Sequence, residues 1–173
     1  MEKIINKVAQ SKLVTIDIES WRPKGKRMLL DLKPWLDQGF VLREKDFRAQ
    51  LKIHQWTQYT DAFVALDCSS KAIVPTWAYM LVSTYLQPYA ARVVRGPLGL
   101  LESILYHEII EKIDIQVYKN ARVIIKGCVQ EAIPENAYSL LIQKLQPVVH
   151  SLMYGKECST VPLFKRTLSR AHS

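Results

Sequence analysis

Three cysteines are the residues whose chemistry and spacing could build a site in this chain. They are Cys68, Cys128 and Cys158. Each precedes a Val-Pro or Ile-Pro pair, with the proline seven, six and four residues further on. Thiolates are good ligands for zinc and for iron–sulfur clusters. The pattern therefore predicts a site for metal or sulfur, and the polar residues beside it are Asp67, Ser69 and Ser159.

Two alternatives stay open for these cysteines. The chain has no C-x-x-C pair, and free cysteines are often small buried hydrophobic residues. A small enzyme with Cys128 as its nucleophile is the other alternative, because a thiol and a histidine can meet in space without being close in sequence. The chain contains no G-x-S-x-G, Walker A, G-x-G-x-x-G or H-E-x-x-H motif. We therefore assign no catalytic residue and expect a protein that is not an enzyme.

An internal repeat relates two of the cysteines. Residues 75–88 and 134–147 match without a gap, with Pro, Ala, Tyr, Leu, Leu, Gln and Pro in the same places. A short apolar strand and a cysteine precede each copy, so the repeated segments cover 63–90 and 122–149. Ligands of parallel sheets bind beyond the carboxyl ends of the strands. The repeat therefore predicts that Cys68 and Cys128 lie at one edge of a sheet.

The elements around the repeat predict an α/β or α+β fold with a small parallel or mixed sheet flanked by helices. Residues 13–19 alternate apolar and polar side chains, which is typical of a half-buried strand. Residues 28–32 follow a Pro-Lys-Gly turn, so we expect a β-hairpin near the N-terminus. We divide the chain into an N-terminal region at 1–61, a core at 62–155 and a basic segment at 156–173.

Composition and charge limit the possible partners. The chain has 173 residues and a net charge of +8, with an excess of five positive charges over 1–60 and of three over 156–173. The densest basic cluster, a candidate site for an acidic partner, is Arg22, Lys24, Lys26 and Arg27. No nucleic-acid-binding signature accompanies this charge. The longest uncharged run, 72–91, contains too many polar residues for a membrane span. We expect a cytoplasmic protein that binds a protein partner or itself.

Four segments carry a resemblance to a known family. They are Glu44–Arg48, Ala72–Leu81, Lys126–Cys128 and Cys158–Pro162. Together they resemble the uncharacterised bacterial proteins catalogued as domain of unknown function 2480, over nearly the whole chain. The resemblance supplies no catalytic residue. It implies a cytoplasmic protein and favours a role near iron–sulfur assembly.

The sequence thus favours an accessory or binding protein that handles metal or sulfur without catalysis. In this hypothesis Cys68, Cys128 and Cys158 are the ligands, and zinc or an iron–sulfur cluster is the cofactor. The alternative is a homo-oligomeric protein–protein interaction module without a metal.

Overall fold

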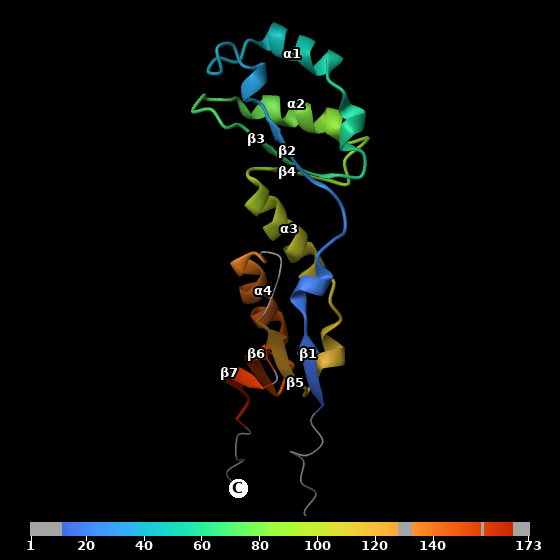
Figure 1. Ribbon diagram of the computed structural model, residues 1–173, viewed down its shortest axis with the longest axis vertical. Helices are drawn as coiled ribbons and strands as arrows, with labels where there is room; N and C mark the ends of the chain where they lie inside the picture. The colour runs from blue at the N-terminus through green and yellow to red at the C-terminus, as the bar shows by residue number, and fades with distance from the viewer. Residues whose placement is uncertain (1–11, 128–132, 157, 168–173) are drawn as a thin grey trace, which may run out of the picture. The chain divides into compact units, whose positions relative to one another are not determined.

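The chain forms two compact units, which we describe separately (Figure 1). The computed structural model describes residues 12–127, 133–156 and 158–167. Unit 1 comprises residues 1–22 and 106–173, and unit 2 comprises residues 23–105. Unit 2 is therefore inserted between two segments of unit 1. These bounds differ from the three parts expected from the sequence, which stay a prediction.

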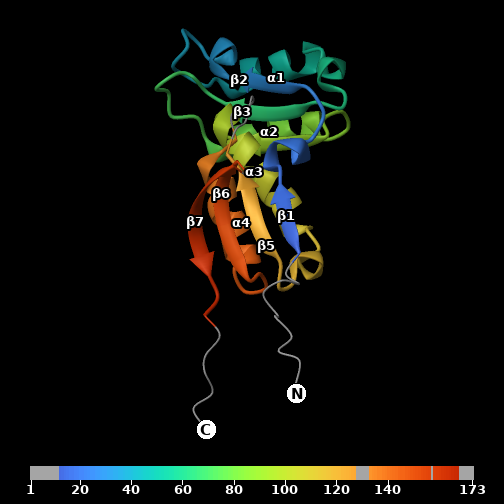
Figure 2. The same ribbon diagram turned by 60° about the horizontal axis from the view of Figure 1, so that its bottom comes forward.

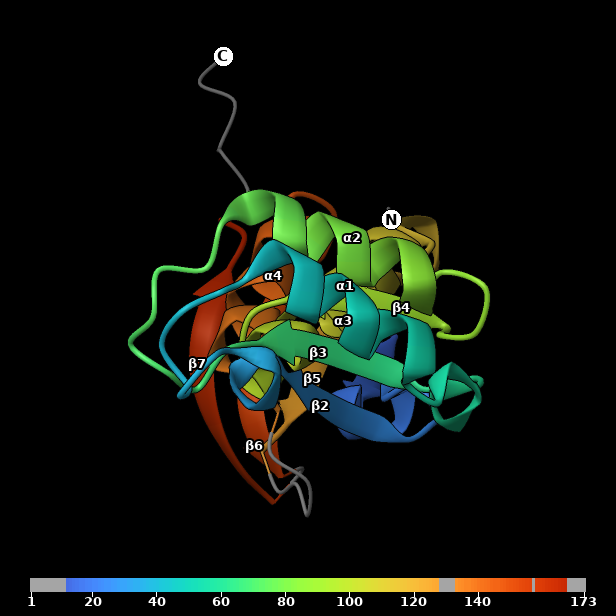
Figure 3. The same cartoon turned by 90° about the horizontal axis from the view of Figure 1, so that it is seen from above.

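Unit 2 contains a parallel three-stranded sheet. Its strands are β2 (Arg27–Asp31), β3 (Phe63–Asp67) and β4 (Arg92–Arg95), in that spatial order. Helices α1 (Glu44–Ile53) and α2 (Thr76–Leu86) lie on one face of this sheet (Figure 3). The core between them is built from fully buried side chains such as Leu51, Leu66 and Val82. Short 3₁₀ turns at Lys33–Trp35 and Trp56–Tyr59 complete the unit.

The other face of this sheet is covered by the first half of α3 (Leu98–Glu111). Leu101 and Leu105 of α3 pack against Ala65 and Val94, and all four side chains are buried. Successive residues of a strand point to opposite faces. Val64 and Leu66 therefore face α1 and α2, whereas Ala65 faces α3. Both faces of β3 are thus buried, as is usual for parallel sheets.

Unit 1 contains a mixed four-stranded sheet (Figure 2). Its strands are β1 (Leu13–Ile16), β5 (Arg122–Lys126), β6 (Ser151–Lys156) and β7 (Ser159–Lys165), and only β7 is antiparallel to its neighbour. Helix α4 (Glu135–Leu145) and the second half of α3 supply Leu141 and Ile110 to the core. Two further 3₁₀ turns lie at Ile18–Trp21 and Ile115–Tyr118.

The predicted α/β class is confirmed, with four α-helices, a mixed sheet and a parallel sheet among the residues that the structure describes, whereas the internal repeat stays a prediction. The predicted N-terminal hairpin is wrong. Strand β1 pairs in parallel with β5, and β2 pairs in parallel with β3, so the two strands belong to different sheets. The apolar residues that predict each strand do not specify its partner strand. Within the described ranges no helix is long and apolar enough to cross a membrane.

Candidate functional site

The three predicted thiol ligands are not brought together among the described residues. Cys68 follows β3 in unit 2, is half-buried and packs against the core there. Cys158 is exposed in the turn between β6 and β7 of unit 1. Cys128 lies outside the described residues. In the part of the chain that the structure describes, no group of three His, Cys, Asp or Glu side chains could hold a metal. The three-thiol site stays a prediction.

The polar residues near Cys68 hold the loop that follows β3. Asp31 ends β2 and accepts hydrogen bonds from the backbone N–H and the hydroxyl of Ser69, at 2.9 and 2.6 Å, and from the N–H of Lys33 at 3.0 Å. Burial opposes ionisation of Asp31, but these hydrogen bonds outweigh it and lower the pKa. Asp67 accepts the N–H of Cys68 at 2.8 Å. Both carboxylates are therefore engaged in positioning backbone.

Tyr79 and Arg95 stand beside Cys68 at the carboxyl edge of β3 and β4. The Arg95 guanidinium lies 4.3 Å from the centre of the Tyr79 ring. Burial raises the pKa of Tyr79, Cys68 and Asp67 raise it further, and Arg95 opposes them. This edge thus gathers one thiol, one phenol and one cation. Ser159, the other predicted neighbour, is exposed at the start of β7 in unit 1.

The predicted basic cluster is divided between the two units. Arg22 belongs to unit 1, and Lys24 and Lys26 are exposed in unit 2. Arg27 is engaged within unit 2. Its Nε donates to Glu102 at 2.6 Å, and its Nη1 donates to the carbonyls of Pro23 and Gly25. The side chains of this ion pair are only 14% and 15% exposed. Arg27 is therefore engaged within unit 2, and an acidic partner at this cluster stays a prediction.

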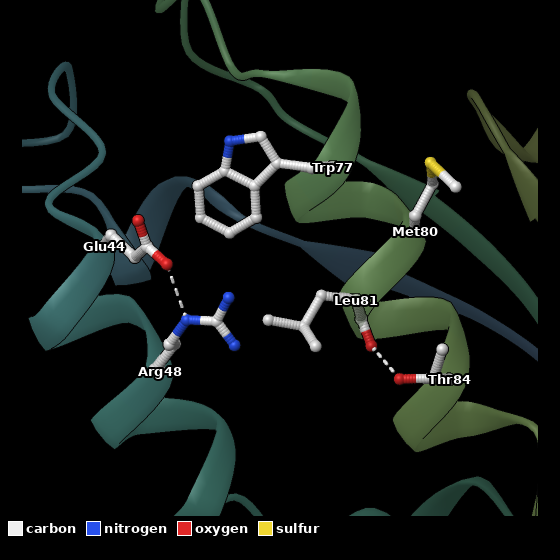
Figure 4. Close-up of a pocket in the computed structure, with 6 residues that line it drawn as sticks. All are labelled: Glu44, Arg48, Trp77, Met80, Leu81 and Thr84. Carbon is white, nitrogen blue, oxygen red and sulfur yellow. Dashed lines mark hydrogen bonds and ion pairs between the residues drawn. The ribbon is translucent and has the colours of Figure 1, made fainter.

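A groove between α1 and α2 is the feature that the sequence did not reveal (Figure 4). We call it the α1/α2 groove, and its volume is about 430 Å³. Its lining residues are Glu44, Arg48, Trp77, Met80, Leu81 and Thr84. Spacing along α2 predicts helix, but it does not tell which apolar residues stay outside the core.

Local interactions fix the walls of the α1/α2 groove. Glu44 lies in the first turn of α1, where a carboxylate is favourable to the helix dipole. It accepts a hydrogen bond from Arg48 one turn later, at 2.8 Å. The Arg48 guanidinium in turn lies 5.6 Å from the centre of the Trp77 ring. Trp77 is half-buried against Phe47, whereas Met80 is 65% exposed. The groove therefore offers an apolar floor with one charge of each sign at its side.

No curated protein and no solved structure matches this chain significantly. One family model matches residues 2–166, which is almost the whole chain and confirms the resemblance seen in the sequence. The chain belongs to the family described as Protein of unknown function (DUF2480).

Proposed function

We propose that this protein is a homo-oligomeric interaction module that binds a second copy of itself through the α1/α2 groove. The observation that carries the proposal is the outer surface of α2. Over Thr76–Leu86 this helix has no charged residue, although Thr76, Met80 and Thr84 are exposed. The centres of protein interfaces are depleted in charge and enriched in aromatic residues, Met and Arg. Trp77, Met80 and Arg48 supply that combination here.

Helix α4 of unit 1 serves as an internal comparison for α2. Each helix connects two neighbouring parallel strands, β3 and β4 in one unit and β5 and β6 in the other. The residues of α4 that lie 59 positions after Trp77, Met80 and Thr84 are Asn136, Ser139 and Gln143. All three are exposed and polar. A helix in this place can therefore fold with a polar outer surface, so the apolar surface of α2 calls for a separate explanation.

This comparison rests on the inference that the two units are copies of one fold, with unit 2 inserted into unit 1. Elements β3, α2 and β4 begin at Phe63, Thr76 and Arg92, and β5, α4 and β6 begin 59 residues later in each case. Asp61 and Asn120, also 59 apart, have left-handed φ values of 56° and 57°. Their N–H groups donate to Tyr89 and Val148, again 59 apart. Matching turns support the equivalence independently of side-chain identity.

A second copy is the occupant that fits the charges of the α1/α2 groove. In a two-fold contact the same patch of both copies forms the interface. Each contact between two residues therefore occurs twice, and the patch must be complementary to itself. Glu44 and Arg48 give the groove one acidic and one basic group. A two-fold arrangement can pair Arg48 of each copy with Glu44 of the other, across an apolar centre formed by Trp77 and Met80. An acidic or basic partner would instead require an excess of one sign.

The experiment is a mass measurement in solution on the full chain and on Met80→Glu. We expect the wild type to have twice the 19.9 kDa mass of one chain. Met80→Glu should be a monomer at the same concentration, because an unpaired charge at an interface centre is costly. Met80 is 65% exposed, so the substitution removes little packing from the fold. Light scattering after gel filtration gives both masses, and circular dichroism verifies folding.

The matched control is Val117→Glu, which adds the same charge at an exposed apolar residue of unit 1. Val117 is 57% exposed. This variant should stay a dimer. Met80→Ser, which places the serine of α4 on α2, should weaken the dimer without adding charge. A monomeric wild type, or a Met80→Glu dimer as stable as the wild type, would contradict the proposal.

Metal or sulfur handling by Cys68, Cys128 and Cys158 remains the sequence-based hypothesis. Support for it comes from the three Cys to Val/Ile-Pro spacings and from the place of Cys68 at the carboxyl end of β3. The interaction module has the stronger support, because its surface residues are described and adjacent. Cytoplasmic location likewise remains a prediction from the sequence.

A further inference from the structure

A second depression lies in unit 1, on the sheet formed by β5, β6 and β7. We call it the basic groove, and its volume is about 590 Å³. Three cationic residues line it, Arg122, Lys165 and Arg166, and His150 lies beside them. Its apolar part is Met153, Pro162 and Phe164. None of the described residues that line it is a carboxylate. The basic groove therefore combines several cations with an apolar surface.

The cations of the basic groove are not neutralised within the part of the chain that the structure describes. No ion pair there joins Arg122, Lys165 or Arg166 to a carboxylate. All three side chains are exposed. Arg166 is held in place, since its backbone N–H donates to the carbonyl of His150 at 2.8 Å and its Nη2 donates to Pro147 at 2.5 Å. Its remaining N–H groups stay available for an anion.

Unit 2 shows what covers the corresponding face of its own sheet. Arg122 and Met153 lie 59 residues after Phe63 and Val94. Phe63 and Val94 pack under the first half of α3, with Leu101 and Leu105 buried against the sheet. In unit 1, strand β7 follows β6 in place of a helix. The helix that packs on Phe63 and Val94 in unit 2 has no counterpart directly after β6 in unit 1, where Arg122 and Met153 line the basic groove.

We propose that the basic groove binds an acidic segment of a partner protein that also carries aromatic or aliphatic side chains. Arg and Lys form charge-assisted hydrogen bonds with carboxylates, and Arg can do so with two parallel bonds. Met153 and Phe164 are half-buried and offer contact area to an apolar side chain. The groove extends over neighbouring strands and is open to solvent, which suits an extended chain. It is independent of the α1/α2 groove in its residues and its chemistry.

The test measures binding of a fluorescein-labelled peptide of alternating glutamate and phenylalanine, by fluorescence anisotropy on the full chain. We expect saturable binding that weakens as salt is added, because exposed charges are screened. Arg122→Ala/Lys165→Ala should reduce the affinity by about tenfold or more, as the loss of charge-assisted hydrogen bonds implies. Both residues are exposed, so the variant should fold.

A matched variant separates the groove from the general positive charge of the protein. Lys119→Ala/Lys156→Ala removes the same charge from exposed residues of unit 1 that do not line the groove. Its affinity should stay within about twofold of the wild type, since exposed charges at a distance contribute little.

Three results would overturn the proposal. The first is an equal loss of affinity in both double variants. The second is a glutamate-only peptide that binds as tightly as the mixed one, which would reduce the groove to a simple anion site. The third is a single-stranded oligonucleotide that binds more tightly than the peptide. Arg122→Ala/Lys165→Ala should keep the mass of the dimer. This mass distinguishes a failure of the basic groove from a failure of the α1/α2 groove.

Discussion

Several buried positions carry the same residue in the two units, whereas outer positions of their helices differ. Val64, Ala78 and Leu86 of unit 2 are almost completely buried, and so are the residues 59 positions later, Val123, Ala137 and Leu145. The outer positions differ, since exposed Met80 and half-buried Trp77 of α2 correspond to exposed Ser139 and Asn136 of α4. Packing constrains the interior, because cores tolerate little change in volume. A surface tolerates substitution, so α2 and α4 can present different outer residues on similar cores.

The sharpest test of this comparison is the removal of equivalent core side chains. Leu86 and Leu145 are both fully buried at the ends of their helices. We expect Leu86→Ala and Leu145→Ala each to lower the free energy of unfolding by about 2–5 kcal/mol, from lost burial and the cavity left behind. Urea denaturation measures the cost, and hydrogen exchange should locate the lost protection in the unit that carries the substitution.

Exposed neighbours on the same helices provide the control. Thr84→Ala and Gln143→Ala should change the free energy of unfolding by no more than about 0.5 kcal/mol. If only one of the two leucine variants is costly, the units are not equivalent in their packing. If the lost protection spreads over both units, they unfold together.

A second comparison concerns the ion pairs of the two units. Arg27 and Glu102 of unit 2 are mostly buried, whereas Lys126 and Asp17 of unit 1, at 2.6 Å, are 40% and 36% exposed. Glu102→Gln should destabilise the protein by about 2 kcal/mol, because it leaves a buried guanidinium with only carbonyl acceptors. Asp17→Asn should cost less than about 1 kcal/mol. Equal costs, measured by urea denaturation, would contradict this ranking.

The smallest predicted effect is a pH dependence confined to unit 2. His54 lies between Trp35 and Trp56, and its Nε2 is 3.0 Å from the Tyr59 hydroxyl. Burial lowers the pKa of His54 below 6.5, so the unfolded chain takes up the proton first as pH falls. This contribution to stability is fully present above pH 6.5 and is lost as pH falls toward the lowered pKa of the folded state.

Unit 1 supplies the control substitution for this histidine. The residue 59 positions after His54 is Ile113, which packs against the core of unit 1. His54→Ile should therefore fold and should flatten the dependence of the unfolding free energy on pH between about 5 and 7.5. A dependence that persists unchanged in His54→Ile would assign it to other groups.

Most individual elements could be predicted from the sequence, because strand and helix periodicity is local. The short apolar strand expected before each copy of the repeat lies in β3, at Phe63–Asp67, and in β5, at Arg122–Lys126. The apolar pattern that follows Pro134 predicts a helix to about Leu152, but α4 ends at Leu145 and β6 begins at Ser151. Pro147 lacks the N–H that a continuing helix needs. The 59-residue offset, applied to Arg92, would have located β6.

The candidate site was less predictable than the fold. The helical spacing of Trp77 predicts a core residue, but the structure leaves it only half-buried, beside Met80 in the α1/α2 groove. The uncharged run at 72–91 was the only signal for this surface in the sequence. The basic groove was missed because Arg122, His150 and Lys165 are distant in sequence and meet only through the pairing of β5, β6 and β7.

The sequence by itself determined the α/β class, the place of most strands and helices, and the family to which the chain belongs. These properties depend on neighbouring residues and on matching patterns. Only the tertiary structure decided that β1 pairs with β5 and not with β2, and which apolar side chains remain outside the core. Strand pairing joins segments that are distant in sequence, and several strands could bury the same apolar face. A local pattern therefore does not specify which strand is the partner.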